Sequence, residues 1–194
     1  VANATFGRIL LPVVPPGSSL PALWSEAYEP IWAACEELDV PVNHHSGAGI
    51  PEYGDDDLGR TMLHSEIAWF VHRATWHLIY GGVFERHPGL KFVITEASAG
   101  WVPGTMTRLD AVTERYRMEG SSAHFFGGRA AARLSLQPSD YFRRNIYLGA
   151  SFLHRNEAMV RHEIGLDRIM WGSDFPHVEG SYPYSREALR ATFA

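Results

Sequence analysis

The sequence predicts an α/β fold built on a parallel β-sheet. Five short apolar segments, starting near residues 8, 40, 90, 145 and 168, alternate with segments of helical periodicity. Such alternation is typical of parallel sheets whose crossover helices pack against the strands. Because the crossovers are right-handed, the carboxyl ends of all strands lie at one edge of the sheet. Side chains that directly follow the strands are therefore expected to meet there.

The composition is that of one globular unit. The 194 residues are 45% hydrophobic and 20% charged, which is enough for a sizeable core. The net charge of −5 argues against a nucleic-acid partner, and no apolar run is long enough to span a membrane. The lone Cys35 and the lack of a secretory signal predict a cytoplasmic protein. Since the first residue is Val1, we expect the natural start to lie upstream.

The first strand and the first helix are separated by a cluster of residues that interrupt secondary structure. An apolar strand at residues 8–14 runs into Pro15, Pro16 and Gly17. Apolar residues then recur at helical spacing over 23–38. Pro30 interrupts this pattern, so it predicts either a break or the first turn of the helix.

Two adjacent histidines end the second strand, which is expected at residues 40–45. Strand side chains alternate, so His44 and His45 face opposite ways. Only one of them can point into a barrel. The small residues at 46–49 that follow leave room for a ligand or ion.

A long segment then separates the second strand from the next helix. Residues 50–62 are expected to form a substrate loop or lid above the strand end. The three aspartates at 55–57 could bind a cation, although a solvated loop is the simpler interpretation. Ser65 is the expected N-cap of a long helix. His64, just before it, is a candidate functional residue.

The third strand ends in an acidic residue. It is expected at residues 90–96 and places Glu96 at its carboxyl end. A turn of small residues at 97–100 follows, and Trp101 marks the beginning of a helix. Residues 120–128 show no clear period and are expected to form a loop.

The stretch from Arg168 to His177 carries the strongest functional signal. A short apolar strand stops at Gly172 and leads to Asp174, followed three residues later by His177. Parallel α/β proteins place catalytic groups at such strand ends. An aspartate that only caps the next turn is the alternative. Because His45 and Glu96 also end strands, the parallel topology predicts that they converge with Asp174.

Three segments resemble the amidohydrolase-related family, which consists of metal-dependent (β/α)8 TIM barrels. The resemblance implies that the chain, residues 1–194, is the C-terminal part of such a barrel, from about strand 4 to strand 8. It also implies that the N-terminal strands and part of the last helix are lacking. The segments that carry it are 38–47 (LDVPVNHHSG), 81–96 (GGVFERHPGLKFVITE) and 168–177 (RIMWGSDFPH).

The resemblance assigns roles to several strand-end residues. It implies that His45 binds a metal and that Asp174 binds the metal or activates its water as the catalytic residue. Glu96 stands where the family often has histidine, and it either binds the cation or ties down the turn that follows. The family's first-strand His-x-His or Glu-x-His pair is not present in this sequence. Substrate contacts are expected from His64, Trp101 and His177.

The function implied is that of a metal-dependent hydrolase. A divalent ion, expected to be zinc, lowers the pKa of bound water to about 7 for attack on a small carbonyl or carboxylate substrate. One alternative is a non-oxidative decarboxylase of an aromatic or muconate-type acid, and another is an inactive fragment or degenerate homologue. Besides a small-molecule substrate, we expect a second copy or the missing barrel half as partner.

Overall fold

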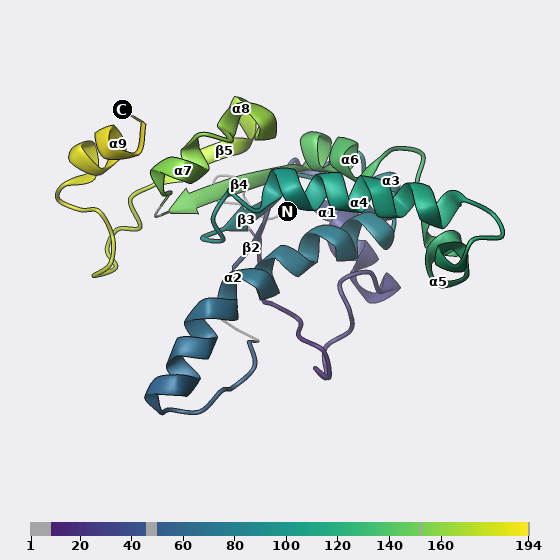
Figure 1. The fold of residues 1–194 in the computed structure, drawn as a ribbon, viewed down its shortest axis with the longest axis horizontal. Coiled ribbons are helices and arrows are strands. Elements are labelled where there is room, and N and C mark those ends of the chain that lie inside the picture. The colour runs from purple at the N-terminus through teal and green to yellow at the C-terminus, as the bar shows by residue number, and fades with distance from the viewer. Residues whose placement is uncertain (1–8, 46–49, 152, 194) are drawn as a thin grey trace.

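The chain forms a single parallel sheet in a computed structural model that describes residues 9–45, 50–151 and 153–193. The five strands lie side by side in chain order, and Figure 1 labels four of them, β2 to β5. This confirms the predicted α/β class. The strands are β1 (Ile9–Leu11), β2 (Val42–His44), β3 (Phe92–Thr95), β4 (Ile146–Ser151) and β5 (Ile169–Gly172).

Helices connect the strands and pack on one face of the sheet. A parallel sheet whose strands keep their chain order, with right-handed crossovers, places its helices on one side, as in a TIM barrel and unlike a doubly wound sheet. The described chain is thus a partial TIM barrel. The helices are η2 (Glu26–Tyr28), α1 (Glu29–Glu37), α2 (Asp57–Tyr80), α3 (Val83–Arg86), α4 (Val102–Arg117), α5 (Ser122–Ala131), α6 (Pro138–Asn145), α7 (Arg155–Ala158), α8 (Arg161–Ile164), η3 (Leu166–Arg168) and α9 (Ser185–Phe193).

The two faces of the sheet differ in burial. On β4, Ile146, Leu148 and Ala150 are buried against the helices, and the residues between them are only partly buried. The opposite face, which would line the inside of a closed barrel, exposes apolar side chains at the two edge strands. Leu10 on β1 is 68% exposed and Met170 on β5 is 46% exposed. Within the described residues, β1 and β5 each pair with one strand, so the sheet forms an open arc.

The start of α1 follows one of the two expected alternatives. The helix begins at Glu29, so Pro30 lies in its first turn, where its missing N–H costs no hydrogen bond. The predicted start of α2 is wrong. That helix begins eight residues before Ser65, because the Asp56 carboxylate caps it by accepting a 2.6 Å hydrogen bond from the Gly59 N–H. The aspartate run therefore begins a helix, and Ser65 lies inside it.

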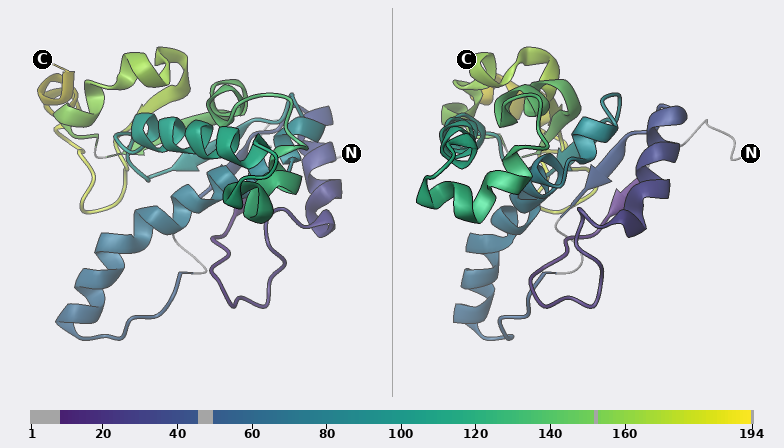
Figure 2. Two further views of the ribbon diagram at one scale, coloured as in Figure 1. Left: turned by 45° about the vertical axis from the view of Figure 1, so that its right-hand side comes forward. Right: turned by 90° about the vertical axis from the view of Figure 1, so that its right-hand side faces the viewer.

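The first half of α2 projects away from the sheet, as Figures 1 and 2 show from three directions. Apart from Gly59, the buried residues of α2 all lie between Phe70 and Ile79. His64 is therefore an exposed residue of the projecting half, not a residue that precedes the helix. It lines a surface hollow formed within the same helix.

Residues 120–128 are another departure from expectation. Most of this stretch belongs to α5, whose N-cap is Ser121, with its Oγ accepting a 3.0 Å hydrogen bond from the His124 N–H. The cap compensates for two glycines inside the helix, which lower its intrinsic propensity. None of the helices in the described chain is both long and apolar enough to cross a bilayer.

Candidate active site

The carboxyl ends of β2, β3 and β5 bring four ionisable side chains together. We call His45, Glu96, Asp174 and His177 the carboxyl-end cluster. His45 Nε2 lies 2.7 Å from Glu96 Oε2, and His177 Nδ1 lies 2.9 Å from Asp174 Oδ2. The possible ligand atoms of Glu96, Asp174 and His177 all lie within 4.8 Å of one another. The predicted convergence of three strand ends is therefore confirmed in geometry, and His177 joins it.

Both carboxylates of the cluster sit on strained backbone. Glu96 has φ 54° and Asp174 has φ 57°, in the left-handed region that side chains with a Cβ rarely adopt. Each such residue costs about 1–2 kcal/mol relative to a right-handed conformation. Strain of this kind persists only where surrounding contacts fix the chain, and it gathers at functional sites.

The carboxylates are shielded while one histidine faces solvent. The side chain of Asp174 is 7% exposed and that of Glu96 is 19% exposed, whereas that of His177 is 58% exposed. Two acidic groups are thus held out of bulk water, and His177 lies between them and the solvent.

The two carboxyl groups perturb each other's pKa in opposite directions. Burial, and then the bond to the neighbouring Asp174 carboxyl, raise the pKa of Glu96. The hydrogen bond from Glu96, and that from His177, lower the pKa of Asp174. The bond to Asp174 in turn raises the pKa of His177. Two carboxyl groups this close repel each other when both are ionised, so Glu96 holds a proton more tightly than Asp174 does.

The donor set fits a divalent cation. Ligands about 2.1–2.5 Å from one ion lie at most about 5 Å apart, and the spacing of Glu96, Asp174 and His177 falls within that limit. A cation would also offset the repulsion between the two carboxyl groups. His45 contacts Glu96 directly, so it can either join the ligands or orient Glu96.

The two adjacent histidines of β2 separate as expected. His44 is 1% exposed, and its Nδ1 lies 3.2 Å from the Leu11 carbonyl oxygen in the neighbouring strand. Burial lowers the pKa of His44 to about 4, so the ring is neutral. His45 faces the other way, into the carboxyl-end cluster. The turn predicted at 46–49 lies outside the described residues.

The ring of Trp101 packs against neighbouring side chains. Its ring stacks on His72 with centroids 4.0 Å apart and meets Phe142 edge-on. Its indole N–H donates to the Ser98 carbonyl oxygen over 3.3 Å. Through these contacts the Trp101 ring links α2, α4 and α6. Substrate binding by Trp101 and His64 stays a prediction.

Glu157 is a further residue of this region, and sequence reasoning missed it. It accepts hydrogen bonds from Ser98 and from the N–H groups of Ala99 and Gly100, so it holds the turn after β3. The hydrogen bonds to this turn thus come from Glu157, while those of Glu96 go to His45 and Asp174. The available signal was a capping-box pattern, since Glu157 lies three residues after the N-cap His154.

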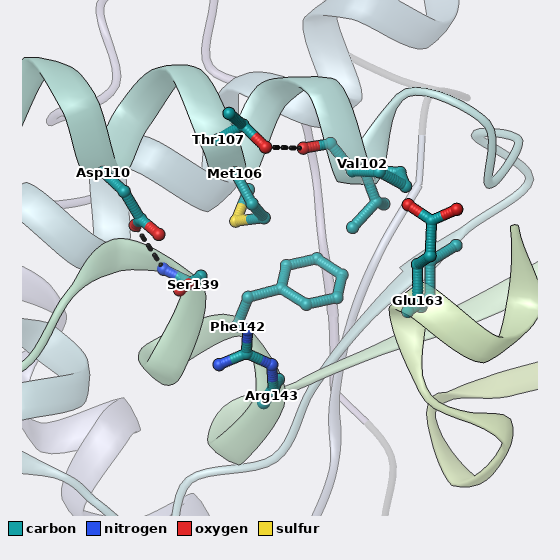
Figure 3. A pocket seen from close by; sticks show the side chains of 10 residues that line it. Val102, Met106, Thr107, Asp110, Ser139, Phe142, Arg143 and Glu163 are labelled. Atoms are coloured by element: carbon teal, nitrogen blue, oxygen red, sulfur yellow. Dashed lines mark hydrogen bonds between the residues drawn. The ribbon is translucent and has the colours of Figure 1, made fainter.

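A separate pocket of about 200 Å³ lies among α4, α6 and α8 on the outside of the helical layer (Figure 3). Two of its polar contacts are made within the protein: the Ser139 N–H donates to Asp110 over 2.9 Å, and Arg143 pairs with Asp140. The lining includes no member of the carboxyl-end cluster. The pocket is thus not part of the candidate active site.

Comparison with known proteins decides the family. The family model described as Amidohydrolase matches residues 1–194. The chain belongs to the amidohydrolase family. This membership confirms the resemblance of the three segments and agrees with the open arc of a TIM barrel.

Curated relatives and solved structures of this family include decarboxylases. A gamma-resorcylate decarboxylase of Polaromonas sp. (strain JS666) is 27% identical over 165 residues, which are 82% of this chain and 47% of that protein. The chain thus spans about half the length of the curated relatives it matches. A 5-carboxyvanillate decarboxylase of Sphingomonas paucimobilis has the same fold, with a TM-score of 0.70 and 21% identity over 97% of this chain and 54% of that one.

A second solved structure contains a metal. It is a dihydroxybenzoic acid decarboxylase of Polaromonas sp. JS666 with bound manganese and the inhibitor 2-nitroresorcinol. Its TM-score is 0.55 and its identity 22%, over 91% of this chain and 54% of that one. At this identity the structural likeness establishes the shared fold.

Proposed function

We propose that the chain forms the half of a metal-dependent decarboxylase that carries the carboxyl-end cluster, and that the substrate is a hydroxylated aromatic acid. The observation that carries the proposal is the meeting of Glu96, Asp174 and His177 within 4.8 Å at the strand ends. The curated relatives, named gamma-resorcylate decarboxylases at 26–27% identity, favour this chemistry over the hydrolysis expected from sequence. Hydrolysis by the same cluster is the competing function.

The cofactor proposed is a divalent cation held by Glu96, Asp174 and His177, with His45 as a further donor. When bound, it would supply positive charge that offsets the negative charge of an acidic substrate. A carboxylate-rich donor set suits manganese better than a purely imidazole or thiolate set would. The manganese of the Polaromonas structure supports this choice, so manganese replaces zinc as the first metal to test.

Asp174 is the proposed proton carrier. Decarboxylation of an aromatic acid breaks the bond between the ring and the carboxylate carbon, and the ring carbon takes up a proton as carbon dioxide leaves. Asp174 is shielded, and it is hydrogen-bonded to the solvent-facing His177. Asp174 can therefore carry the proton that the ring carbon takes up, with its carboxyl group oriented by His177, as general acid catalysis requires.

The activity is proposed for a closed barrel. The edge strands β1 and β5 present unpaired backbone groups, and Leu10 and Met170 expose apolar surface on the inner face. Open edges of this kind invite strand pairing with another segment. We propose that a second copy or the remaining barrel strands cover them. A monodisperse monomer of residues 1–194 with a sharp two-state melt would contradict this.

Product analysis tests the reaction. Protein that carries this chain, loaded with Mn²⁺, is incubated with hydroxybenzoates and, separately, with lactones and esters. We expect carbon dioxide release from a hydroxybenzoate, abolished by chelation and restored by Mn²⁺. Lactone or ester hydrolysis without carbon dioxide release would overturn the proposal in favour of a hydrolase. Failure to bind Mn²⁺ would indicate a degenerate homologue.

A further inference from the structure

The turn that follows Glu96 is held by a carboxylate from a distant part of the chain. Glu157 lies on α7, after β4, and its Oε1 accepts from Ser98 Oγ. The same oxygen accepts from the N–H groups of Ala99 over 3.3 Å and Gly100 over 3.2 Å. Oε1 of Glu157 thus accepts three hydrogen bonds, although Glu157 is not itself a proposed metal ligand.

The second oxygen of Glu157 ties the turn to another loop. Oε2 accepts a 3.1 Å hydrogen bond from the N–H of His154, the N-cap of α7. The carboxylate therefore links the loop after β3, which carries Glu96, to the loop after β4. It also lies at the amino end of α4, where a negative charge is stabilised by the helix dipole.

The sequence of the turn suits this contact. A Cβ on Gly100 would lie 3.2 Å from Glu157 Cγ and 3.3 Å from its Oε1, closer than most side chains approach. Glycine therefore lets the carboxylate reach the backbone. From the other side, His72 Nε2 donates to the Ala97 carbonyl oxygen over 2.6 Å. The four residues after Glu96 are thus fixed by side chains from two helices, α2 and α7.

We propose that Glu157 is a positioning residue for the metal site, because it fixes the turn that directs Glu96 toward Asp174. Glu96 is held at φ 54° and Ser98, which bonds Glu157, at φ 61°. Two strained residues so close together relax when the contact that holds them is removed. The inference rests on the proposed function, since that proposal makes Glu96 a ligand.

Supporting residues around metal ligands typically contribute 10–100-fold to metal affinity. Glu157 acts through the backbone of the turn, so we expect Glu157→Ala to weaken Mn²⁺ binding by about 10-fold or more. Glu157→Gln should weaken it less, because the amide oxygen can still accept from Ser98, Ala99 and Gly100. The control is Glu163→Ala on α8, which removes an exposed carboxylate that lines the outer pocket of Figure 3.

Calorimetric titration with Mn²⁺, well below each variant's melting temperature, measures the effect on the folded protein. A merely structural Glu157 would lower the melting temperature and leave the dissociation constant unchanged, which would overturn the inference. If Glu157→Ala does not fold, Ser98→Ala, which removes one donor to the Glu157 carboxylate, provides the comparison, and an unchanged dissociation constant there has the same meaning.

A metal-free measurement separates this inference from the proposed function. The His45 ring touches Glu96 at 2.7 Å, so its nitrogen resonances report where that carboxylate lies. We expect them to shift in metal-free Glu157→Ala and to stay constant in Glu163→Ala. Unshifted His45 resonances would contradict the positioning role, even if the wild-type chain binds no Mn²⁺ and the proposed function fails.

Discussion

The two ends of the sheet both combine histidine with two carboxylates, but they pair the charges differently. At the amino end of β3, His87 lies between Glu29 and Glu36 of α1, with ring-nitrogen to oxygen distances of 2.7 and 2.8 Å. Arg86 makes two 3.0 Å hydrogen bonds to Glu29. We call these four residues the amino-end cluster. Each carboxylate there has a cationic or N–H partner.

At the carboxyl end, by contrast, two carboxyl groups contact each other. Glu96 and Asp174 shift each other's pKa in opposite directions and sit on left-handed backbone, whereas no residue of the amino-end cluster is among those with positive φ. The amino-end turn is also fixed from within the core, because the buried Asn145 donates to the Pro88 and Leu90 carbonyl oxygens. Carboxylates that each have their own partner on relaxed backbone stabilise the fold, while two carboxyl groups in contact on strained backbone mark a binding site.

The largest expected effect is on turnover. Asp174→Asn keeps the shape of the side chain and removes its basicity. In the metal-loaded protein we expect turnover to fall at least about a hundredfold, the lower range of general acid–base contributions. Thermal stability should change little. Near-normal turnover together with a loss of about 1 kcal/mol in stability, as for a lost cap, would remove Asp174 from the mechanism.

A paired substitution on β2 tests which histidine serves the site. His45→Ala should reduce the bound metal after purification, because it removes a side chain that contacts Glu96. His44→Ala should leave the metal content unchanged and lower stability by about 2–4 kcal/mol, the cost of a cavity in the core. Metal analysis and denaturant unfolding of both variants give the answer. Equal metal loss in the two would show that the strand register is wrong.

The buried His44 also predicts a pH dependence. Burial depresses its pKa from 6.5 to about 4, so the unfolded chain binds more protons between these values. Stability should therefore be full above pH 6.5 and fall by about 3 kcal/mol as the pH drops to 4. Urea unfolding across this range checks the slope. His44→Leu should flatten it, and an unchanged slope in that variant would assign the effect to other groups.

A smaller effect is expected from the amino-end cluster. The hydrogen bond from Arg86 lowers the pKa of Glu29 from 4.5 to about 2. The stability that Glu29 adds is thus present above pH 4.5 and is lost as the pH falls toward 2. Glu29 is partly exposed, so solvent screening limits the gain. Glu29→Gln should lower stability slightly at pH 7 and remove this part of the acid dependence. An identical acid profile would show that the pair contributes nothing measurable.

Sequence alone predicted the framework because apolar strand runs and strand-end residues are local signals. The convergence of His45, Glu96 and Asp174 followed from parallel topology, and the alternation of His44 and His45 from strand geometry. Helix starts were less predictable, since Asp56 and Ser65 are both good caps and only the folded chain shows which one bonds a free N–H.

Contacts between segments far apart in the sequence could not be predicted from the sequence. Glu157 is 59 residues from Ser98, and no local pattern shows that its carboxylate reaches that turn. His177 was expected to touch substrate, but its position beside Asp174 makes it a possible ligand as well. Both depend on how loops after different strands fold over one another.

Titration of variants from both clusters with Mn²⁺ tests most directly whether the metal site lies in the carboxyl-end cluster. We expect the chain to bind one Mn²⁺ with an affinity that Glu96→Gln and Asp174→Asn each reduce about 10-fold or more. His87→Gln, at the amino end, should leave that affinity unchanged while lowering the melting temperature. Binding that survives both carboxyl-end substitutions, or that His87→Gln abolishes in folded protein, would contradict the assignment of the metal site to Glu96, Asp174 and His177.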